Sequence, residues 1–337
     1  MNTAEFDVIC FGRNSIDLYS QEPGKEFEEI AGFNAFVGGS PLNIAVGCKR
    51  LGLKSSLLSA VGKDKVGDFV LNFLRKENVD TSNTAVIPGT RTPAVILGIE
   101  PPDKFPLVYY RDNASDSQIG IDQVMKSKID KCRILQMSGT ALNMEPSRSA
   151  AFFAAEIAMK NNIPVFLDLD FRADQWHDVR AYGVVIRAFL QYVNIVLGTR
   201  EEILAACLTD PAKVKISHQQ ISSPEIEGNI HDAVSTILDA GTEALIVKTG
   251  FHGSSVYLPG KKEEQVPGFP VEVLNILGAG DAFAAGFIYG YLKGWDWYKC
   301  CRMGNACGAF LVTKPGCANF NPYEAEILAF IEARGGF

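Results

Sequence analysis

The sequence has few features that would tie the chain to nucleic acid or to a membrane. Its 32 lysines and arginines are outnumbered by 39 aspartates and glutamates, which gives a net charge of −7 at pH 7. An acidic chain is a poor candidate for binding nucleic acid or an anionic lipid surface. No apolar run approaches the ~18 residues that span a bilayer, and the N-terminus has no basic and apolar secretion signal. We therefore expect a cytoplasmic protein with neither kind of partner.

Motifs for metal, redox and common nucleotide chemistry are also missing. The eight cysteines contain no C-x-x-C pair, and the four histidines lie far apart. We expect reduced, structural thiols. Gly62 and Gly67 have the glycine spacing of a P-loop, but Asp68-Phe69 stands where that motif requires Lys-Ser/Thr. No G-x-G-x-x-G follows the first apolar run, which disfavours a nicotinamide-dependent dehydrogenase.

What the sequence does contain is a regular alternation of short apolar runs and longer amphipathic ones. Its 337 residues, 47% of them hydrophobic, are enough for one large domain or two modest ones. The predicted strands are Phe6–Phe11, Ser56–Val61, Arg133–Met137, Pro164–Leu169, Asn194–Leu197, Ala244–Lys248 and Ser255–Leu258. The predicted helices are Pro41–Leu51, Gly67–Glu77, Pro146–Lys160, Ala181–Leu190, Arg200–Cys207, Ile230–Asp239, Gly280–Lys293, Trp297–Val312 and Pro322–Glu332. This order predicts an α/β fold with a mainly parallel sheet between two layers of helices.

Three segments interrupt the alternation. Residues 14–37 and 88–116 read as extended segments with turns, which predicts a small second sheet over one end of the main one. Residues 209–228 are polar and contain two prolines, so we expect an insertion or loop there. The first predicted helix has clear punctuation, with Ser40 as a candidate cap, Pro41 in the first turn and Gly52 after the end.

The segment around residue 280 is the most informative one for chemistry. Gly278-Ala279-Gly280 forms a turn of small residues directly before a helix. Such a turn lets backbone N–H groups approach an anion, and the helix N-terminus adds partial positive charge. Asp281 follows, where a carboxylate could accept a proton from an attacking hydroxyl. The alternative is an ordinary tight turn with Asp281 as a first-turn acid.

A second glycine-rich segment precedes the first helix. Gly38-Gly39 allows close backbone approach to a ligand, and the amide of Asn43 could bind sugar hydroxyls. Asp17, after the first predicted strand, could bind two hydroxyls. Taken singly, each of these features is also typical of a simple turn or a solvated loop.

Together these segments resemble the two signatures of the ribokinase-like (PfkB) carbohydrate kinase family. The first resemblance spans Gly38–Ala45 and Gly62–Gly67, and the second spans Gly278–Phe287, about 240 residues later. The resemblance covers nearly the whole chain and implies one domain, residues 1–337, with a three-layer α/β/α core. It also implies that segments 14–37 and 88–116 form a β-sheet lid, through which two chains could pair as a homodimer.

Further matches resemble the branch of this family that phosphorylates the terminal hydroxyl of 5-dehydro-2-deoxy-D-gluconate. They lie in Gly12-Arg13, Asp17–Tyr19, Phe105–Asp116 and Asp168–Arg172. Such a sugar acid needs a cation for its carboxylate, and Arg111 is our first choice, Arg13 the second, with Arg172 as a further substrate contact. The alternatives are a 2-keto-3-deoxygluconate kinase, another sugar kinase of fructokinase or ribokinase type, and a non-catalytic sugar-binding regulator.

The resemblance also implies ATP and Mg²⁺ as cofactors. By position, Lys248, Gly250, Gly253 and Asn305 would bind the nucleotide, Gly278, Ala279 and Gly280 would stabilise the transferring phosphoryl group, and Asp281 would act as the base. Glu201, in Gly198-Thr199-Arg200-Glu201, would organise the metal through water, although glycine replaces the family's asparagine. Asn275-Ile276 replaces the Asp-Thr common in the family, which argues against a monovalent-cation site beside this loop.

Overall fold

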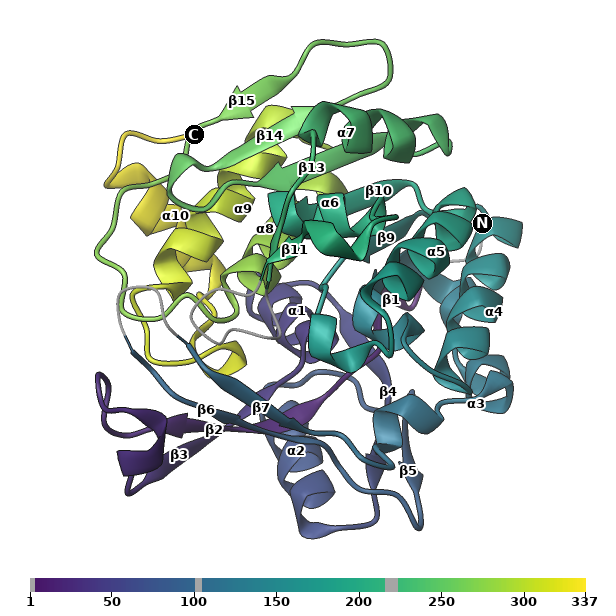
Figure 1. Ribbon diagram of the computed structural model, residues 1–337, viewed down its shortest axis with the longest axis vertical. Coiled ribbons are helices and arrows are strands. Elements are labelled where there is room, and N and C mark those ends of the chain that lie inside the picture. Colours follow the sequence, from purple (N-terminus) through teal and green to yellow (C-terminus); the bar gives the residue numbers. More distant parts are fainter. Residues whose placement is uncertain (1–3, 101–104, 216–223) are drawn as a thin grey trace.

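The centre of the molecule is a sheet of nine strands, seen in the computed structural model, which describes residues 4–100, 105–215 and 224–337 (Figure 1). The strand order is β15-β14-β13-β10-β9-β8-β1-β4-β5. In chain order these strands are β1 (Phe6–Phe11), β4 (Ser55–Gly62), β5 (Thr84–Ile87), β8 (Cys132–Ser138), β9 (Val165–Asp168), β10 (Ile195–Thr199), β13 (Ala244–Lys248), β14 (Ser254–Tyr257) and β15 (Glu264–Val266). The strands from β5 to β13 pair in parallel, and β14 and β15 are antiparallel.

Helices cover both faces of this sheet, so the sheet is buried from two sides. One face packs against α3 (Ile121–Lys126), α4 (Ser147–Lys160), α5 (Val179–Phe189), α6 (Arg200–Ala206) and α7 (Ile230–Asp239). The other face packs against α1 (Ser40–Arg50), α2 (Lys65–Lys76), α8 (Ala279–Leu292), α9 (Trp297–Leu311) and α10 (Glu324–Glu332). In β1, Ile9 and Phe11 join the first core while Val8 and Cys10 join the second. A strand buried on both faces therefore reads as a continuous apolar run.

A small sheet of four strands lies apart from the central one, at the lower left of Figure 1. Its order is β3-β2-β6-β7, with β2 (Ser15–Ser20), β3 (Phe33–Gly38), β6 (Ala94–Leu97) and β7 (Leu107–Tyr110). Alternate residues separate its two faces, since Val95 and Leu97 are buried whereas Val108 and Tyr110 are exposed. The buried face packs around Tyr19 and Cys317, between this sheet and the C-terminal part of the chain.

The predicted fold class is confirmed, as is the small second sheet. Each predicted strand of the central sheet begins and ends within one or two residues of the observed one. The sequence analysis missed β5, β15 and α3, which are short and carry little of the apolar pattern. Part of segment 88–116, residues 101–104, lies outside the described residues. The homodimer and the cytoplasmic location stay predictions.

The sequence predicted a serine cap for α1 and an insertion or loop at residues 209–228. Ser40 does not cap α1, because it is the first helical residue and Gly39 takes the cap position with φ of +98°. A side chain at Gly39 would also place its Cβ 2.5 Å from the carbonyl oxygen of Arg13. In segment 209–228, β11 (Val214–Lys215) pairs with β12 (Glu225–Ile226), and residues 216–223 between them lie outside the described part.

The state of the cysteines agrees with the expectation of reduced, structural thiols. All eight cysteines are free thiols, and seven of them are buried. Among the helices that the structure describes, none combines the length and the apolar character needed to cross a membrane.

Candidate active site

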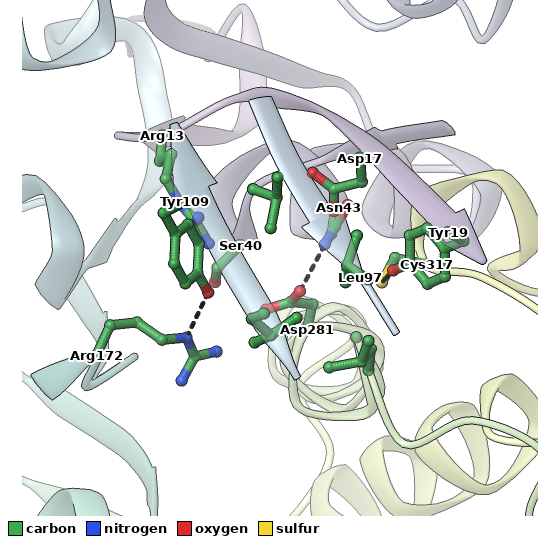
Figure 2. A pocket seen from close by; sticks show the side chains of 15 residues that line it. Arg13, Asp17, Tyr19, Ser40, Asn43, Leu97, Tyr109, Arg172, Asp281 and Cys317 are labelled. Atoms are coloured by element: carbon green, nitrogen blue, oxygen red, sulfur yellow. Dashed lines mark hydrogen bonds between the residues drawn. The ribbon is translucent and has the colours of Figure 1, made fainter. Parts of the chain in front are cut away.

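An open pocket of about 400 Å³ lies between the small sheet and the N-terminal ends of α1 and α8 (Figure 2). Its polar lining is Arg13, Asp17, Ser40, Asn43, Tyr109, Arg172 and Asp281, and its apolar wall includes Val95, Leu97, Leu107 and Leu277. These residues come from both ends of the chain. The structure thus brings together Arg13, Asp17, Gly39, Asn43, Arg172, Gly278 and Asp281 of the residues predicted from sequence.

Asp281 lies in the first turn of α8 and points into the pocket. The helix begins after Gly278, whose φ of +80° is a conformation that glycine adopts without strain. The side-chain amide of Asn43 donates a hydrogen bond to Oδ2 of Asp281 at 2.7 Å, as Figure 2 shows. Burial, and then the negative charge of Asp170, raises the pKa of Asp281. A partly buried carboxylate that receives a hydrogen bond from this amide is suited to accept a proton.

The glycine turn before Asp281 is closely surrounded. A Cβ on Gly278 would lie 2.7 Å from the sulfur of Cys317, and a Cβ on Gly280 would lie 3.0 Å from Nζ of Lys248. At Gly278 only glycine fits, and at Gly280 a larger residue would press against the ammonium of Lys248. The lysine ammonium and the N-terminus of α8 meet at this turn, and together they favour an anion there.

Lys248, the last residue of β13, is held in place by buried acids. Its Nζ donates to both carboxylate oxygens of Asp168, at 3.1 and 3.2 Å, and lies 3.9 Å from the carboxylate of Glu202. Burial raises the pKa of Asp168 to about 7, against the opposing effect of Lys248. Burial alone would lower the pKa of Lys248, but the two carboxylates outweigh it and raise that pKa.

The structure separates the two neighbouring glutamates of α6. Glu201, which the sequence analysis assigned to the metal, has a side chain that is 42% exposed and faces Arg200. Glu202 is buried, accepts a hydrogen bond from the backbone N–H of Thr199 and faces Lys248. Within the described residues, no group of three or more His, Cys, Asp or Glu side chains converges in a way that could hold a metal ion.

Asp17 occupies the side of the pocket formed by the small sheet. The hydroxyl of Ser15 donates to Oδ1 of Asp17 at 2.6 Å. Burial raises the pKa of Asp17 to about 6, and the hydrogen bond from Ser15 opposes that rise. Gly38, on the neighbouring strand β3, pairs with Ser15, and a Cβ on Gly38 would stand 2.0 Å from the Asp17 carboxylate. Gly38 therefore makes room for this carboxylate.

Two arginines and a tyrosine form the other side of the pocket. In Figure 2 the guanidinium of Arg13 lies beside the ring of Tyr109, 5.1 Å from its centroid, and Tyr109 Oη accepts a hydrogen bond from Nε of Arg172 at 3.2 Å. Arg172 also pairs with Asp170 at 3.0 Å. Burial would raise the pKa of Asp170, but the charges of Arg172 and Arg13 lower it to about 2.

Arg111 lies elsewhere, outside the pocket lining. Its guanidinium forms a buried ion pair with Asp116 and donates to the side chains of Gln175 and Ser117. Its position directly after β7 places it where the small sheet joins the main body. The structure therefore does not group Arg111 with the other predicted substrate residues.

The four residues predicted to bind the nucleotide do not all lie together. Lys248 lies at the glycine turn, as described above. Gly253 and Asn305 meet at the carbonyl of Val266, where a Cβ on Gly253 would stand 2.2 Å away and the Asn305 amide donates at 3.1 Å. Gly250 is exposed, with open space around it.

Sequence reasoning missed the functional placement of Tyr109, Asp168, Asp170 and Glu202. Asp168 is the last residue of β9 and Asp170 follows it, at the carboxyl end of parallel strands where ligand sites lie. That position was a usable signal, whereas Tyr109 and its exposed neighbour Tyr110 look alike in sequence.

Comparison with known sequences connects this geometry to a family. The model of the pfkB family carbohydrate kinases matches residues 5–324. The chain is 33% identical over 329 residues to a 5-dehydro-2-deoxygluconokinase of Clostridium tetani, covering 97% of this chain and 93% of that protein. It is 31% identical over 328 residues to 5-dehydro-2-deoxygluconokinase 1 of Bacillus cereus, covering 97% and 95%.

Solved structures agree on the fold. A sugar kinase of Pyrococcus horikoshii in complex with ATP superposes with a TM-score of 0.78 at 26% identity, over 97% of this chain and 99% of that one. A protein described as a ribokinase II from E. coli, in complex with ATP and Mg²⁺, has a TM-score of 0.84 at 22% identity, over 97% and 99% of the two chains.

Proposed function

Because the chain belongs to the pfkB family of carbohydrate kinases, we propose that it transfers the γ-phosphoryl group of ATP to the terminal hydroxyl of 5-dehydro-2-deoxy-D-gluconate. The observation that carries this proposal is the placement of Asp281. It is a partly buried carboxylate in the first turn of α8, in a pocket that also contains the buried Arg13 and the partly buried Arg172. The names of the relatives in Clostridium tetani and Bacillus cereus support the substrate.

In this mechanism Asp281 accepts the proton of the terminal hydroxyl as its oxygen attacks phosphorus. The amide of Asn43 orients the carboxylate through the 2.7 Å hydrogen bond. Asp17, which faces the pocket from the small sheet, accepts hydrogen bonds from other sugar hydroxyls. Phosphoryl transfer depends mostly on positioning and on charge stabilisation, which is what these fixed groups provide.

The transferring phosphoryl group would lie at the turn formed by Gly278, Ala279 and Gly280. The space left by the two glycines and the ammonium of Lys248 fit phosphate oxygens at this turn. ATP would supply the phosphoryl group, and Mg²⁺ brought in with the nucleotide would neutralise part of the phosphate charge. Asp168 and Glu202 hold Lys248 at the turn, and Glu202, rather than Glu201, is the glutamate of α6 that faces this lysine.

The substrate class follows from the charge of the pocket. Arg13 supplies a positive charge on the side away from Asp17 and Asp281, beside Arg172, which is paired with Asp170. A carboxylate is the group that a planar guanidinium binds best. Both keto-deoxy sugar acids, 5-dehydro-2-deoxygluconate and 2-keto-3-deoxygluconate, carry one, whereas ribose, fructose and adenosine carry none.

The experiment that tests this function is an ADP-release assay over a panel of acceptors. The panel holds 5-dehydro-2-deoxygluconate, 2-keto-3-deoxygluconate, ribose, fructose, fructose 6-phosphate and adenosine, each with MgATP. We expect the highest kcat/KM with the first compound. A higher kcat/KM with 2-keto-3-deoxygluconate would move the function to that kinase, and absence of ADP release with every acceptor would point to a non-catalytic regulator.

The raised pKa values of the carboxylates give a prediction for pH. We expect kcat/KM for the sugar acid to fall as the pH drops through about 6, because Asp17, with its pKa of about 6, then becomes protonated, loses its charge and accepts fewer and weaker hydrogen bonds. Ser15→Ala removes a hydrogen bond that stabilises the charged form, so the acidic limb should move to higher pH. The measurement is the pH profile of kcat/KM.

Ser82→Ala is the matched control for this shift. Ser82 donates to Oδ1 of Asp80 at 2.6 Å, with the same spacing of two residues, but at the surface. Its profile should overlay that of the wild type. An unmoved acidic limb in Ser15→Ala would remove Asp17 from the account of the pH dependence.

Potassium should stimulate activity little, while Mg²⁺ or Mn²⁺ is required. Asn275 is buried, and its Oδ1 already accepts a hydrogen bond from the N–H of Leu277 at 3.0 Å. Its Nδ2 is buried without a partner among the described residues and, as a donor, repels a cation. The measurement is turnover in K⁺ against tetramethylammonium at equal ionic strength. Strong activation specific to K⁺ would show that backbone oxygens alone build a cation site here.

A further inference from the structure

Arg13 is a buried cation that the protein itself leaves incompletely satisfied. It follows β1 and is only 5% exposed, yet it lines the pocket. Its Nε is buried and has no hydrogen-bond partner among the described residues. Buried charges and donors are normally paired, so such a group in a pocket indicates a ligand that completes it.

The acids near Arg13 are engaged elsewhere. Asp17 accepts a hydrogen bond from Ser15 at 2.6 Å. Asp170 accepts hydrogen bonds from Ser138 and Thr140, at 2.8 and 3.0 Å, and pairs with Arg172. Burial would lower the pKa of Arg13, but both carboxylates raise it through their charge, so the guanidinium is charged.

Tyr109 fixes the orientation of Arg13. The guanidinium lies beside the ring, 5.1 Å from its centroid, and the ring is held in turn by the hydrogen bond from Arg172 to its hydroxyl. An arginine beside an aromatic ring gains cation–π energy and keeps its in-plane N–H groups free. Those groups form the fork that binds a carboxylate through two parallel hydrogen bonds.

The other two arginines have less to offer a ligand. Arg172 uses Nε on Tyr109, Nη1 on the carbonyl of Phe171 and Nη2 on Asp170. Nε of Arg111 is also buried without a partner among the described residues, but Arg111 is neutralised by Asp116 and lies outside the pocket lining. Arg13 is thus the arginine of the pocket with an unpartnered, buried donor.

We propose that Arg13 binds the carboxylate of the sugar acid, with Tyr109 holding its guanidinium in place, and that Arg111 instead fixes the junction between the small sheet and the main body. This assignment rests on the proposed function, because it specifies how a sugar-acid substrate is recognised. It makes Arg13 the residue that distinguishes an acid from a neutral sugar of the same shape.

The test compares two acceptors, 5-dehydro-2-deoxygluconate and its primary amide, which lacks the negative charge. In Arg13→Ala, kcat/KM for the acid should fall roughly 10- to 150-fold, the value of a hydrogen bond to a charged group. The fall should appear mainly in KM, and kcat/KM for the amide should change little. Arg13→Lys should recover part of the loss, since lysine offers a point charge without the fork.

Two further variants serve as comparisons. Arg133→Ala removes the same charge from the start of β8, where the side chain is 47% exposed and pairs with Asp7. This variant should leave kcat/KM unchanged for both the acid and the amide. Arg111→Ala should lower kcat/KM for the acid and the amide by the same factor. The assignment would be overturned if Arg111→Ala lowered kcat/KM for the acid more than for the amide while Arg13→Ala lowered both equally.

Folding and function are controlled separately. Thermal unfolding of each variant with and without MgATP shows whether the chain still folds and binds nucleotide, and Arg13→Gln provides a second substitution of similar size. Equal falls for acid and amide in a folded Arg13→Gln variant would also contradict the carboxylate role. Failure of the proposed function looks different, because the wild type itself would then not phosphorylate the acid.

Discussion

Replacing Asp281 by asparagine is expected to lower kcat by about 10²–10⁴-fold, the usual contribution of a general base, while KM changes much less. Asparagine keeps the size of the side chain and an oxygen that can accept the hydrogen bond of Asn43. It cannot accept the proton of the attacking hydroxyl at neutral pH. The measurement is steady-state ADP release with saturating sugar acid and MgATP.

Asp68→Asn is the matched control for this variant. Asp68 is also an acid in the first turn of a helix, α2, but its side chain is 69% exposed and lies outside the pocket lining. Its kcat should stay at the wild-type level. A kcat near wild type in Asp281→Asn would remove the base from the mechanism and leave only the glycine turn and Lys248 to explain turnover.

Gly38→Ala should lower kcat/KM for the sugar acid by about 10²-fold, the order expected for misplacing a reacting group by about 1 Å. The new Cβ would stand 2.0 Å from Oδ2 of Asp17, with the other carboxylate atoms at 2.2 and 2.3 Å. Asp17 must therefore rotate out of its site on β2. The side chain of Asp281 belongs to a different element, so MgATP binding should remain.

Gly120→Ala provides the comparison for Gly38→Ala. At Gly120 the nearest atom to a new Cβ is the Oε1 of Gln123, at 3.2 Å, which is the far end of a flexible side chain. This variant should keep the wild-type kcat/KM. If Gly38→Ala were equally active, the close packing of Gly38 on Asp17 would have no role in holding the substrate.

The central sheet could be predicted from sequence because its strands are buried on both faces. Runs such as residues 6–11 and 244–248 are almost entirely apolar, and both boundaries of each were predicted correctly. The 3.6-residue apolar pattern likewise predicted both ends of α7 correctly. In contrast, β15 is a three-residue edge strand with two exposed residues, which leaves no apolar run to detect.

The site was predictable where a backbone conformation demands a particular residue. Gly278 and Gly39 have positive φ, and Gly38 makes room for a carboxylate, so glycine at these positions could be noticed in the sequence. Lys248, the last residue of β13, was named only through the resemblance to the family. Asp281 was found because it follows the glycine turn at a helix start.

The sequence could not show which of two arginines, or which of two glutamates, lies in the site. Arg111 and Arg13 both follow a strand, and only the partner of each side chain distinguishes them: Asp116, near in sequence, neutralises one, while Tyr109, 96 positions away, flanks the other. Glu201 and Glu202 are adjacent, and the helix places one at the surface and the other in the core. Pairings between distant segments are set by the tertiary fold and leave no local pattern.

The central claim is that the chain phosphorylates the terminal hydroxyl of a keto-deoxy sugar acid. The measurement that tests it most directly is the ³¹P and ¹³C NMR spectrum of the product formed from 5-dehydro-2-deoxy-D-gluconate and MgATP. We predict one phosphate ester, coupled to the terminal CH₂ carbon, formed in equal amount to ADP. Inorganic phosphate as the sole new phosphorus product, or an ester on a secondary hydroxyl, would contradict the account.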